Sequence, residues 1–348
     1  MQISPQDLIN GNEILPLRLR GEMISTIATN YNMTLFGPDI KINSIVPINN
    51  IGYIFPVPVL TYLSSPQYAA CLGDSTGNAV TGNAVICKPE LRSLVPDDNC
   101  VLLTDYPEDI FFSILSDMIR NNEYQQLMGH IDKSSCIEHS AHIGKHVYIE
   151  KNVYVGHNVV IYPNVYLGEG VSIKANSTIG GEGFQPKILD GKRVLIPHAG
   201  GVWLSAGVQI GSNTCIDKGL YGEFTFLGEN TTVDNLVHIA HAVITGKSCA
   251  LVAGSEVSGS VHLGDYVWLG PNTCINPSLS LGNSCYIGSG SVVVRDLPAH
   301  VLAYGNPARI KGWSCVCRGK LSFIGNCSTC IICGRTYKLT SEQMVVSA

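Results

Sequence analysis

The sequence predicts a mainly β protein built on a parallel β-helix, because aliphatic residues recur at a fixed spacing of six along two long stretches. That period is neither the 3.6 of an amphipathic helix nor the 2 of an alternating strand. The 36 glycines and the charged fraction of only 14% suit a turn-rich, strongly buried β fold. The unbroken first series is Ile131, Ile137, Ile143, Ile149, Val155, Ile161, Leu167, Ile173 and Ile179. The second, with Thr245 as its one exception, is Leu227, Val233, Ile239, Thr245, Leu251, Val257, Leu263, Leu269, Ile275, Leu281, Ile287 and Val293.

Three hexapeptides form one coil of such a β-helix, and each aliphatic side chain points into a narrow core. Four residues after most aliphatic positions stands a small or β-branched residue, such as Val153 or Thr231, which suits a tight corner. Evenly spaced ordinary strands would not keep a period of six for so long. Because each coil covers only its neighbours, flat faces are left for self-association, and we expect an oligomer. The period alone does not determine the hand of the coil.

Three domains are expected along the chain. Residues 1–130 show the mixed patterning of an α/β domain, residues 131–300 form the β-helix, and residues 301–348 form a tail. An irregular segment at 181–201 interrupts the period, and loops of this kind often carry binding residues. Within the first domain the pattern predicts helices over 21–31 and 108–121, and strands over 42–46 and 83–86.

Charge and composition narrow the function. A net charge of −5 offers no electrostatic footprint for nucleic acid or an anionic membrane. No apolar run approaches membrane-spanning length, and the start MQISPQDLINGNE does not resemble a signal peptide, so we expect a cytoplasmic protein. Eight of the thirteen cysteines are scattered singly and are expected to be small buried hydrophobic residues.

The other five cysteines lie together in the tail, in CVCRGKLSFIGNCSTCIICGRTYKL. Two close cysteine pairs on a short hairpin are the ligand set of a zinc ribbon, because tetrahedral zinc takes four thiolates from two tight turns. We expect the ligands to be Cys315, Cys317, Cys330 and Cys333, with Cys327 as an alternative to Cys330 or Cys333. Such a closed site is structural. The alternative is a tail with free thiols.

The segment VDNLVHIAHAV places two imidazoles, His238 and His241, within one hexapeptide. Histidine titrates near neutral pH and can act as general base toward an amine that attacks a thioester. His241 lies two places after core residue Ile239, at an outward or corner position, and His238 lies one place before it, where we expect it to face a neighbouring chain. A surface histidine taken alone is more often solvated or structural.

Asp234 to His241, preceded by IGSNTCIDKG, resembles the UDP-3-O-acylglucosamine N-acyltransferases and the related hexapeptide-repeat sugar N-acetyltransferases, over nearly the whole chain. The resemblance implies a left-handed β-helix, a homotrimer with active sites between subunits, and His241 as catalytic base. LTYLSSPQYAACLG resembles a uridine-binding domain in which two aromatic rings sandwich uracil, here Tyr62 and Tyr68. A flat base gains most between two π-faces, although both tyrosines could simply be packing residues.

Three departures from the lipid A pattern concern the acyl donor. Ser278 stands where that family has a second histidine, and His198 stands where it has glutamine. The tail has GNPARIKG and the cysteine cluster in place of a helical end that docks a carrier protein. GNPAR resembles the element beside coenzyme A in acetyl-CoA-dependent hexapeptide transferases. These differences favour acetyl-CoA, or another short acyl-CoA, as the donor.

The function expected from these patterns is transfer of an acetyl group to the amine of a UDP- or dTDP-linked amino sugar, in O-antigen, capsule or lipopolysaccharide synthesis. His241 would deprotonate the amine for direct attack, without a covalent intermediate. A backbone N–H one coil away would stabilise the oxyanion, and one coil of about 18 residues places Gly259 over His241. Gly254 is a second candidate for the oxyanion. The candidates for binding the acceptor are Asp234, Asn235, His238, Glu182 and Phe184. The candidates for binding coenzyme A phosphates are Arg309 and Lys311.

Two other functions remain open. One is a lipid A N-acyltransferase that uses an acyl carrier protein, which would need an apolar tunnel for a fatty chain. The other is a trimeric scaffold whose ribbon is a docking or nucleic-acid module. His139 and His157, 18 residues apart, should stack on adjacent coils and could bind a metal, although no third ligand stands at a convincing spacing.

Overall fold

The structure is a computed structural model that describes residues 2–10, 13–48, 58–72, 82–340 and 345–347. It divides into two compact units. The first contains residues 1–126, 184–200 and 220–223, and the second contains residues 127–183, 201–219 and 224–348. The tail after residue 300 therefore groups with the β-helix. The division into three domains that each fold independently stays a prediction.

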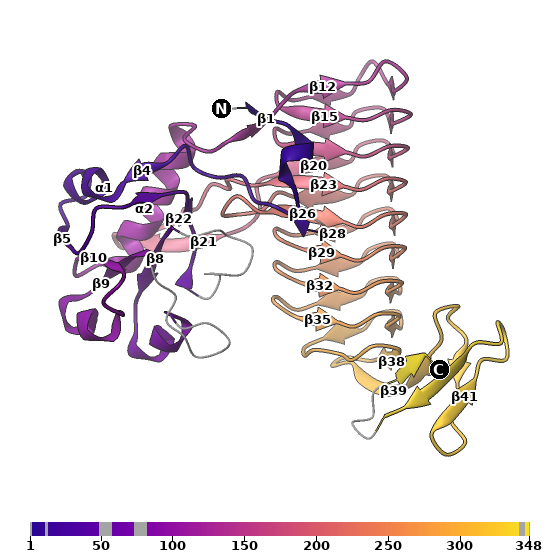
Figure 1. Ribbon diagram of the computed structural model, residues 1–348. Coiled ribbons are helices and arrows are strands. Elements are labelled where there is room, and N and C mark those ends of the chain that lie inside the picture. The colour runs from indigo at the N-terminus through magenta and orange to yellow at the C-terminus, as the bar shows by residue number, and fades with distance from the viewer. Residues whose placement is uncertain (1, 11–12, 49–57, 73–81, 341–344, 348) are drawn as a thin grey trace. The chain divides into compact units, whose positions relative to one another are not determined.

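The first unit is an α/β structure around one five-stranded sheet (Figure 1). Its order is β5-β10-β9-β8-β7, parallel except for the antiparallel pair β5 and β10. The strands are β5 (Thr34–Phe36), β7 (Ser44–Ile45), β8 (Val59–Leu63), β9 (Ala84–Cys87) and β10 (Cys100–Leu103). The helices are α1 (Ile24–Asn30) and α2 (Pro107–Arg120), with 3-10 turns η1 (Pro5–Leu8), η3 (Pro66–Leu72) and η4 (Pro89–Leu94). Short strands are β1 (Gln2–Ile3), β2 (Ile9–Asn10), β3 (Glu13–Ile14), β4 (Glu22–Met23), β6 (Lys41–Ile42) and β11 (Gln126–Leu127).

Helix α2 lies within one residue of its predicted bounds, and its sequence explains both ends. Pro107 occupies the first helical turn, where its missing N–H costs nothing, and Glu108 and Asp109 complement the positive end of the helix dipole. Its apolar side, including the buried Phe111 and Phe112, packs against the sheet. The strand predicted over 42–46 is instead divided between β6 and β7, which pair with different partners.

The segment that interrupts the β-helix folds into a hairpin of the first unit. Its strands are β21 (Pro186–Leu189) and β22 (Lys192–Leu195), which pair antiparallel. Lys187 donates to Glu108 at 2.7 Å and lies 4.6 Å from the ring centre of Phe112. A second, shorter excursion at 220–223 also belongs to the first unit, and the sequence analysis did not predict it.

The second unit is a left-handed parallel β-helix whose coils stack along one axis (Figure 1). Each coil contributes a strand to each of three parallel sheets. One sheet contains β12 (His130–Ile131), β15 (Val147–Ile149), β18 (Val165–Leu167), β23 (Gly201–Leu204), β26 (Phe224–Leu227), β29 (Ile244–Thr245), β32 (His262–Leu263) and β35 (Ser280–Leu281). The second begins with β13 (Cys136–Ile137), β16 (Tyr154–Val155), β19 (Ser172–Ile173), β24 (Gln209–Ile210), β27 (Thr232–Val233), β30 (Ala250–Leu251), β33 (Trp268–Leu269) and β36 (Tyr286–Ile287). The third contains β14 (His142–Ile143), β17 (Val160–Ile161), β20 (Thr178–Gly181), β25 (Cys215–Asp217), β28 (His238–Ile239), β31 (Glu256–Val257), β34 (Cys274–Ile275) and β37 (Val292–Val293).

The register explains the hexapeptide period. In coils without an excursion a strand pairs with the residues 18 positions away, as His130 does with Tyr148, so every third aliphatic residue stacks in one column. The two excursions lengthen this separation, to 37 between Val165 and Val202 and to 23 between Gly201 and Phe224. These side chains form a single buried core that runs through the β-helix. The exceptional Thr245 is buried too, and its Oγ1 accepts a hydrogen bond from the backbone N–H of Gly228 at 3.1 Å. Ile131, in the first coil, is 48% exposed because only one neighbouring coil covers it.

The expectation for the single cysteines is only half correct. Four of the eight are buried, namely Cys87, Cys100, Cys249 and Cys285. Cys136 and Cys215 are exposed, and Cys71 and Cys274 are partly exposed. On the β-helix the exposed or partly exposed ones stand directly before a core residue on a strand, and successive side chains of a strand point to opposite faces.

The tail continues the second sheet and then forms the ribbon at the last coils (yellow in Figure 1). Strands β38 (Val301–Tyr304), β39 (Arg309–Ser314) and β40 (Lys320–Leu321) extend that sheet beyond β36. A separate sheet contains β41 (Cys327–Thr329), β42 (Thr336–Leu339) and β43 (Val345–Ser347). None of the described helices is long and apolar enough to cross a membrane.

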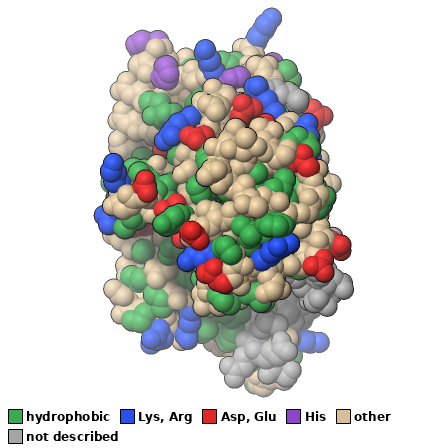
Figure 2. All heavy atoms as spheres, turned by 90° about the vertical axis from the view of Figure 1, so that its left-hand side faces the viewer, with side chains coloured by type: hydrophobic (Ala, Val, Ile, Leu, Met, Phe, Trp, Pro, Cys, Tyr) green, Lys and Arg blue, Asp and Glu red, His purple; other side chains and the backbone are tan. Residues whose placement is uncertain are grey.

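Acidic and basic side chains are interspersed with hydrophobic ones on the face of the molecule shown in Figure 2. Among the described residues of that face, neither sign of charge forms a continuous field. A nucleic-acid surface depends on clustered lysine and arginine. This face does not have that character.

Candidate active site

His241 lies in the turn between β28 and β29, at a corner of the β-helix, and its side chain is partly buried. The turn is held by its neighbouring coils. The N–H of Ala242, which has a φ of 57°, donates to Thr225 Oγ1 at 3.0 Å, and the His241 carbonyl accepts from the N–H of Ser260 at 2.9 Å. These bonds place the imidazole on a rigid element, as a catalytic group requires.

Gly259, one coil further along the chain, lies directly against the His241 ring. A Cβ atom added to Gly259 would stand 2.6 Å from His241 Nε2, closer than such atoms pack. Only glycine leaves room for the imidazole here. The other oxyanion candidate, Gly254, already donates its N–H to the Asn235 carbonyl at 3.2 Å. Gly259 is therefore the better of the two candidates.

His238 lies on β28 and faces away from the core. Its Nε2 stands 3.0 Å from Asp217 Oδ2, and the two side chains are 45% and 13% exposed. The hydrogen bond to Asp217 raises the pKa of His238, against the opposing effect of burial, and the charge of Glu256 on the next coil adds to the rise. Lys218, next to Asp217 in sequence, donates to Glu182 at 2.6 Å. A histidine–aspartate pair and a lysine–glutamate pair thus involve two consecutive residues, Asp217 at the end of β25 and Lys218 directly after it.

Replacing Asp217 with asparagine is expected to lower the pKa of His238 toward the ordinary value of about 6.5. A raised pKa means that the pair contributes stability fully below the unfolded-state pKa, and that this stability is lost as pH rises through the folded-state pKa. The pKa is measurable from the imidazole Cε1–H signal in an NMR titration. A midpoint in Asp217→Asn equal to that of the wild type would contradict the assignment. The variant His142→Ala removes a histidine on the same sheet, which identifies the signal of His142 and serves as control.

Asp234 and Asn235 hold the turns of adjacent coils together. Asp234 accepts from the N–H groups of Asn235 at 2.8 Å and Ala253 at 3.2 Å. Asn235 Oδ1 accepts from the N–H of Ser212 at 2.7 Å. These bonds account for both residues as turn caps. A direct contact of either residue with substrate stays a prediction.

Tyr62 and Tyr68 belong to the first unit, on β8 and in η3. The ring of Tyr62 packs 4.7 Å from that of Phe111, and burial, with the charge of Glu108 and the proximity of Tyr68, raises its pKa to about 12. Tyr68 is 43% exposed. One face of Tyr62 is therefore committed to the core, and the exposed Tyr68 offers a face for a ligand. Gly73, which ends the motif quoted for this pair, lies outside the described residues.

Four further candidates stand in other surroundings. Phe184 is 74% exposed and belongs to the first unit, whereas Glu182 belongs to the second. Arg309 and Lys311 are exposed on β39, where Arg309 donates to its neighbouring carbonyl of Ala308 and Lys311 lies 5.8 Å from the ring centre of Tyr304. The roles of these four residues stay predictions.

An open groove of about 550 Å³ runs along the sheet that follows His241. It begins at Ile244, three residues after His241, and passes His262 toward Leu297 and Pro298. Burial lowers the pKa of His262, which favours its neutral form. Half of its ten lining residues are apolar, and three of these belong to the core and are at most 3% exposed. The apolar residues are Ile244, Leu263, Leu281, Leu297 and Pro298, and the others are His262, Ser280, Asp296 and two glycines.

Among the described residues of the second unit, two groups of side chains could hold a metal ion. Cys315, Cys317, Cys330 and Cys333 come together, and exposed Cys327 is not among them. His139 and His157 stack on adjacent coils with ring centres 5.8 Å apart, as their spacing predicted, and Glu138 joins them. Glu138 stands 3.7 Å from His157 Nε2. It is the third candidate ligand that the sequence analysis did not find, although it directly precedes His139.

Asp217 and Thr225 were also missed by sequence reasoning. The excursion at 220–223 lengthens its coil, so that Cys215 pairs with His238 at a separation of 23 instead of 18. Counting back 18 residues from His238 or His241 along the sequence therefore reaches neither Asp217 nor Thr225. The only signal in the sequence is the break in the six-residue period before Leu227.

Hexapeptide coils with an imidazole at one corner place this chain in the class of hexapeptide-repeat proteins. Residues 146–181 match the family described as bacterial transferase hexapeptide (six repeats). The chain is 40% identical over 121 residues to a UDP-3-O-acylglucosamine N-acyltransferase of Caulobacter sp. (strain K31). These 121 residues cover 34% of this chain and 35% of the relative. A probable mitochondrial UDP-3-O-acylglucosamine N-acyltransferase 2 of Arabidopsis thaliana is 38% identical over 107 residues, or 31% of this chain and 35% of the relative. The chain is thus a homologue of these N-acyltransferases, and it spans about a third of the length of the curated relatives it matches.

Among solved structures, a UDP-N-acetylglucosamine acyltransferase from Bacteroides fragilis is similar, with a TM-score of 0.41 and 21% identity over 53% of this chain and 74% of its own. The corresponding O-acyltransferase from Moraxella catarrhalis has a TM-score of 0.36 and 26% identity over 53% of this chain and 73% of its own. Scores this low do not bear on function.

Two expectations need correction. The similarity covers about a third of the chain, not nearly all of it. The expected acetyl transfer from acetyl-CoA is wrong, because the relatives are named for acylation of UDP-3-O-acylglucosamine. The departures that favoured acetyl-CoA have structural roles instead. His198 is buried beside the Ile196 carbonyl, Ser278 occupies a turn position with a φ of 60°, and Ala308 of GNPAR closes the last coil by donating to Val292.

Proposed function

We propose that the protein is an N-acyltransferase that acylates the amine of a UDP-linked acylated glucosamine, with His241 as general base. The observation that carries this proposal is the His241 imidazole, held against Gly259 at a corner of the β-helix. The homology to UDP-3-O-acylglucosamine N-acyltransferases supports the choice of reaction and acceptor.

The proposed reaction is a direct transfer. The amine attacks the thioester carbonyl and forms the C–N bond while His241 accepts a proton from the nitrogen. The tetrahedral intermediate then collapses, the C–S bond breaks, and the imidazolium returns the proton to the departing thiolate. No covalent bond to the protein is formed. The backbone N–H of Gly259 is the proposed donor to the oxyanion, because its position beside His241 places it near the reacting carbonyl.

The acyl donor is proposed to be a long-chain thioester on an acyl carrier protein. A chain of many methylenes needs apolar surface, and each buried CH₂ contributes about 0.8 kcal/mol. The groove that includes Ile244, three residues after the proposed base, is the proposed place for this chain. Acetyl would leave this groove unfilled.

Recognition of the uracil base is proposed for the first unit. The exposed face of Tyr68, with Tyr62 behind it, would stack on uracil. The flat sheets of the β-helix further suit a homotrimer with the site between subunits.

The function is tested by following thiol release from purified protein with UDP-3-O-acylglucosamine as acceptor. A long-chain acyl carrier protein is expected to support turnover at least about tenfold faster than acetyl-CoA, since the chain adds buried apolar area. UDP-N-acetylglucosamine, which has no free amine, is the matched control acceptor. Equal or faster turnover with acetyl-CoA would reject the donor, and absence of turnover with either donor would reject the function.

A further inference from the structure

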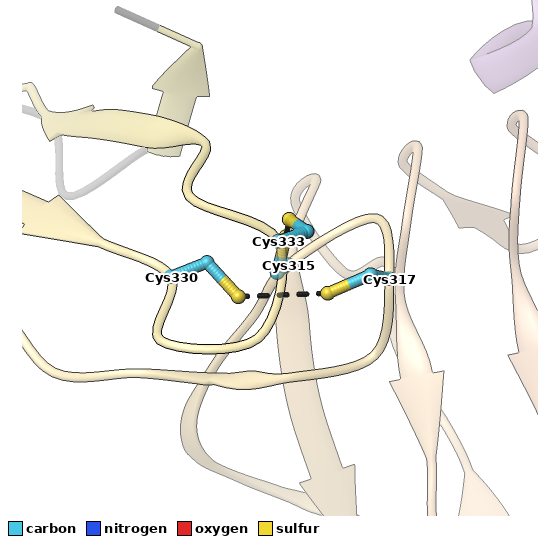
Figure 3. Close-up of side chains that lie close together, drawn as sticks. All are labelled: Cys315, Cys317, Cys330 and Cys333. Carbon is cyan, nitrogen blue, oxygen red and sulfur yellow. Dashed lines mark hydrogen bonds between the residues drawn. The ribbon is translucent and has the colours of Figure 1, made fainter.

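The cysteine cluster of the tail is not used by the proposed acyl transfer. Its four Sγ atoms all lie within 4.8 Å of one another, with 3.4 Å between Cys315 and Cys333 and 3.5 Å between Cys317 and Cys330 (Figure 3). A disulfide would hold two sulfurs at about 2.05 Å, so these are not bonded pairs. Four thiolates about 2.3 Å from a tetrahedral zinc ion stand about 3.8 Å from one another. The cluster has the size of that tetrahedron.

Two tight turns deliver the four sulfurs from opposite sides (Figure 3). In the first, after β39, the N–H of Cys315 donates to the Gly319 carbonyl at 2.8 Å. In the second, between β41 and β42, the N–H of Cys330 donates to the Arg335 carbonyl at 2.8 Å. A Cβ atom on Gly319 would lie 2.9 Å from Cys330 Sγ, so glycine is what allows the two turns to meet.

A second layer of contacts orients the ligands. The Tyr337 hydroxyl accepts the N–H of Val316 at 3.3 Å and stands 3.0 Å from Cys315 Sγ. A hydroxyl at this distance can donate a hydrogen bond to a thiolate. Outer contacts of this kind are typical of metal ligands.

Two further contacts attach the ribbon to the last coils. The Arg318 guanidinium lies 4.4 Å from the ring centre of Trp268, and the His300 ring lies 5.0 Å from that of Tyr337. The ribbon has a core of only Cys315, Leu321, Cys330 and Tyr337, with a few partly buried neighbours. A segment this small does not bury enough apolar surface to fold without a crosslink.

We propose that Cys315, Cys317, Cys330 and Cys333 bind one structural zinc ion, which folds the carboxy-terminal ribbon and holds it against the last coils of the β-helix. Four sulfur ligands in a tetrahedral arrangement select zinc or iron among biological metals. All four positions are protein ligands, so the site is closed and supplies no catalysis. Cys327 is outside the site, because it lies exposed on β41 opposite Lys338.

The test is the metal content of the full-length protein, measured by mass spectrometry after gel filtration. One zinc per chain is expected in the wild type and in Cys327→Ser, the matched control. Cys330→Ser is expected to lose zinc at least about tenfold, and Tyr337→Phe to weaken zinc affinity about 10- to 100-fold. Wild-type protein without zinc, iron in its place, or loss of zinc in Cys327→Ser but not in Cys330→Ser would overturn the proposal.

Two further measurements distinguish zinc at the four cysteines from zinc at the histidine cluster and from a general loss of folding. Cobalt exchanged into the wild type is expected to show sulfur-to-metal charge-transfer absorption, which the nitrogen and oxygen ligands of Glu138, His139 and His157 cannot produce. Removal of zinc from the wild-type protein with a chelator is expected to expose the ribbon to protease, and addition of zinc is expected to restore protection. This measurement uses no variant, so it holds even if Cys330→Ser does not fold. Neither readout depends on acyl transfer, so a failure of the proposed function leaves this test intact.

Discussion

His241→Ala is expected to lower kcat for acyl transfer by roughly 10²- to 10⁴-fold, the usual contribution of a general base. The amine must lose a proton as it attacks, and alanine has no acceptor for it. The ring is only partly buried, and its turn is held by backbone bonds to Thr225 and Ser260. The fold should therefore survive the change, and KM should change less than kcat.

The matched control is His142→Ala, which removes an exposed histidine on the sheet that contains β28, the strand before His241. It should retain wild-type turnover, and circular dichroism and gel filtration of both variants check that fold and assembly are unchanged. Retained turnover in a folded His241→Ala protein would remove His241 from the mechanism. Loss of turnover in both variants would show that the assay reports on the β-helix in general.

Ile239→Ala is expected to lower the free energy of unfolding by about 2–5 kcal/mol, the usual cost of removing a large aliphatic side chain from a packed core. Ile239 has no exposed surface and stacks between Ile216 and Val257 in the column of the third sheet. The coils above and below cannot collapse into the space, because their own hydrogen bonds hold them at the strand spacing. The change also stands between His238 and His241, so activity should fall with stability.

The same substitution at the first coil provides the comparison. Ile131 occupies the same place in its hexapeptide but is 48% exposed, so Ile131→Ala should cost less than about 1 kcal/mol. Both variants are to be measured by urea unfolding at constant m. Equal destabilisation by the two substitutions would contradict the claim that burial by adjacent coils decides the contribution of each aliphatic position.

The β-helix was predictable because its signal is local and repeated. Ile161 or Leu269 needs only its place in the period to be assigned to the core, since every coil presents the same environment. The cysteine cluster was predictable for a related reason, as each pair of ligands is delivered by one short turn. Helix α2 could be placed from its proline, its first-turn carboxylates and its apolar periodicity. The first-coil residue Ile131 was misjudged, because a period carries no information about where the stack of coils ends.

The surroundings of the candidate base were less accessible to sequence reasoning. Asp217 pairs with His238 and Thr225 supports the turn of His241, but the excursion at 220–223 lengthens this coil, so neither partner stands at the usual coil spacing. The acyl donor was misjudged from Ser278, His198 and GNPAR, three local features that the fold uses for turns, burial and closure of the last coil. Local differences cannot reveal an apolar groove, which is formed by residues from successive coils.

Spacing along the chain was enough to predict the hexapeptide period, the column of aliphatic side chains, the clustered cysteines and the position of His241 one coil before Gly259. Each of these follows from the repeat of neighbouring coils every 18 residues or from a short local turn. The folded chain was needed to show that His238 pairs with Asp217, that Glu138 joins His139 and His157, and that Tyr337 meets Cys315. Those contacts depend on side-chain direction and on how excursions shift one coil against the next, and neither is encoded in a period.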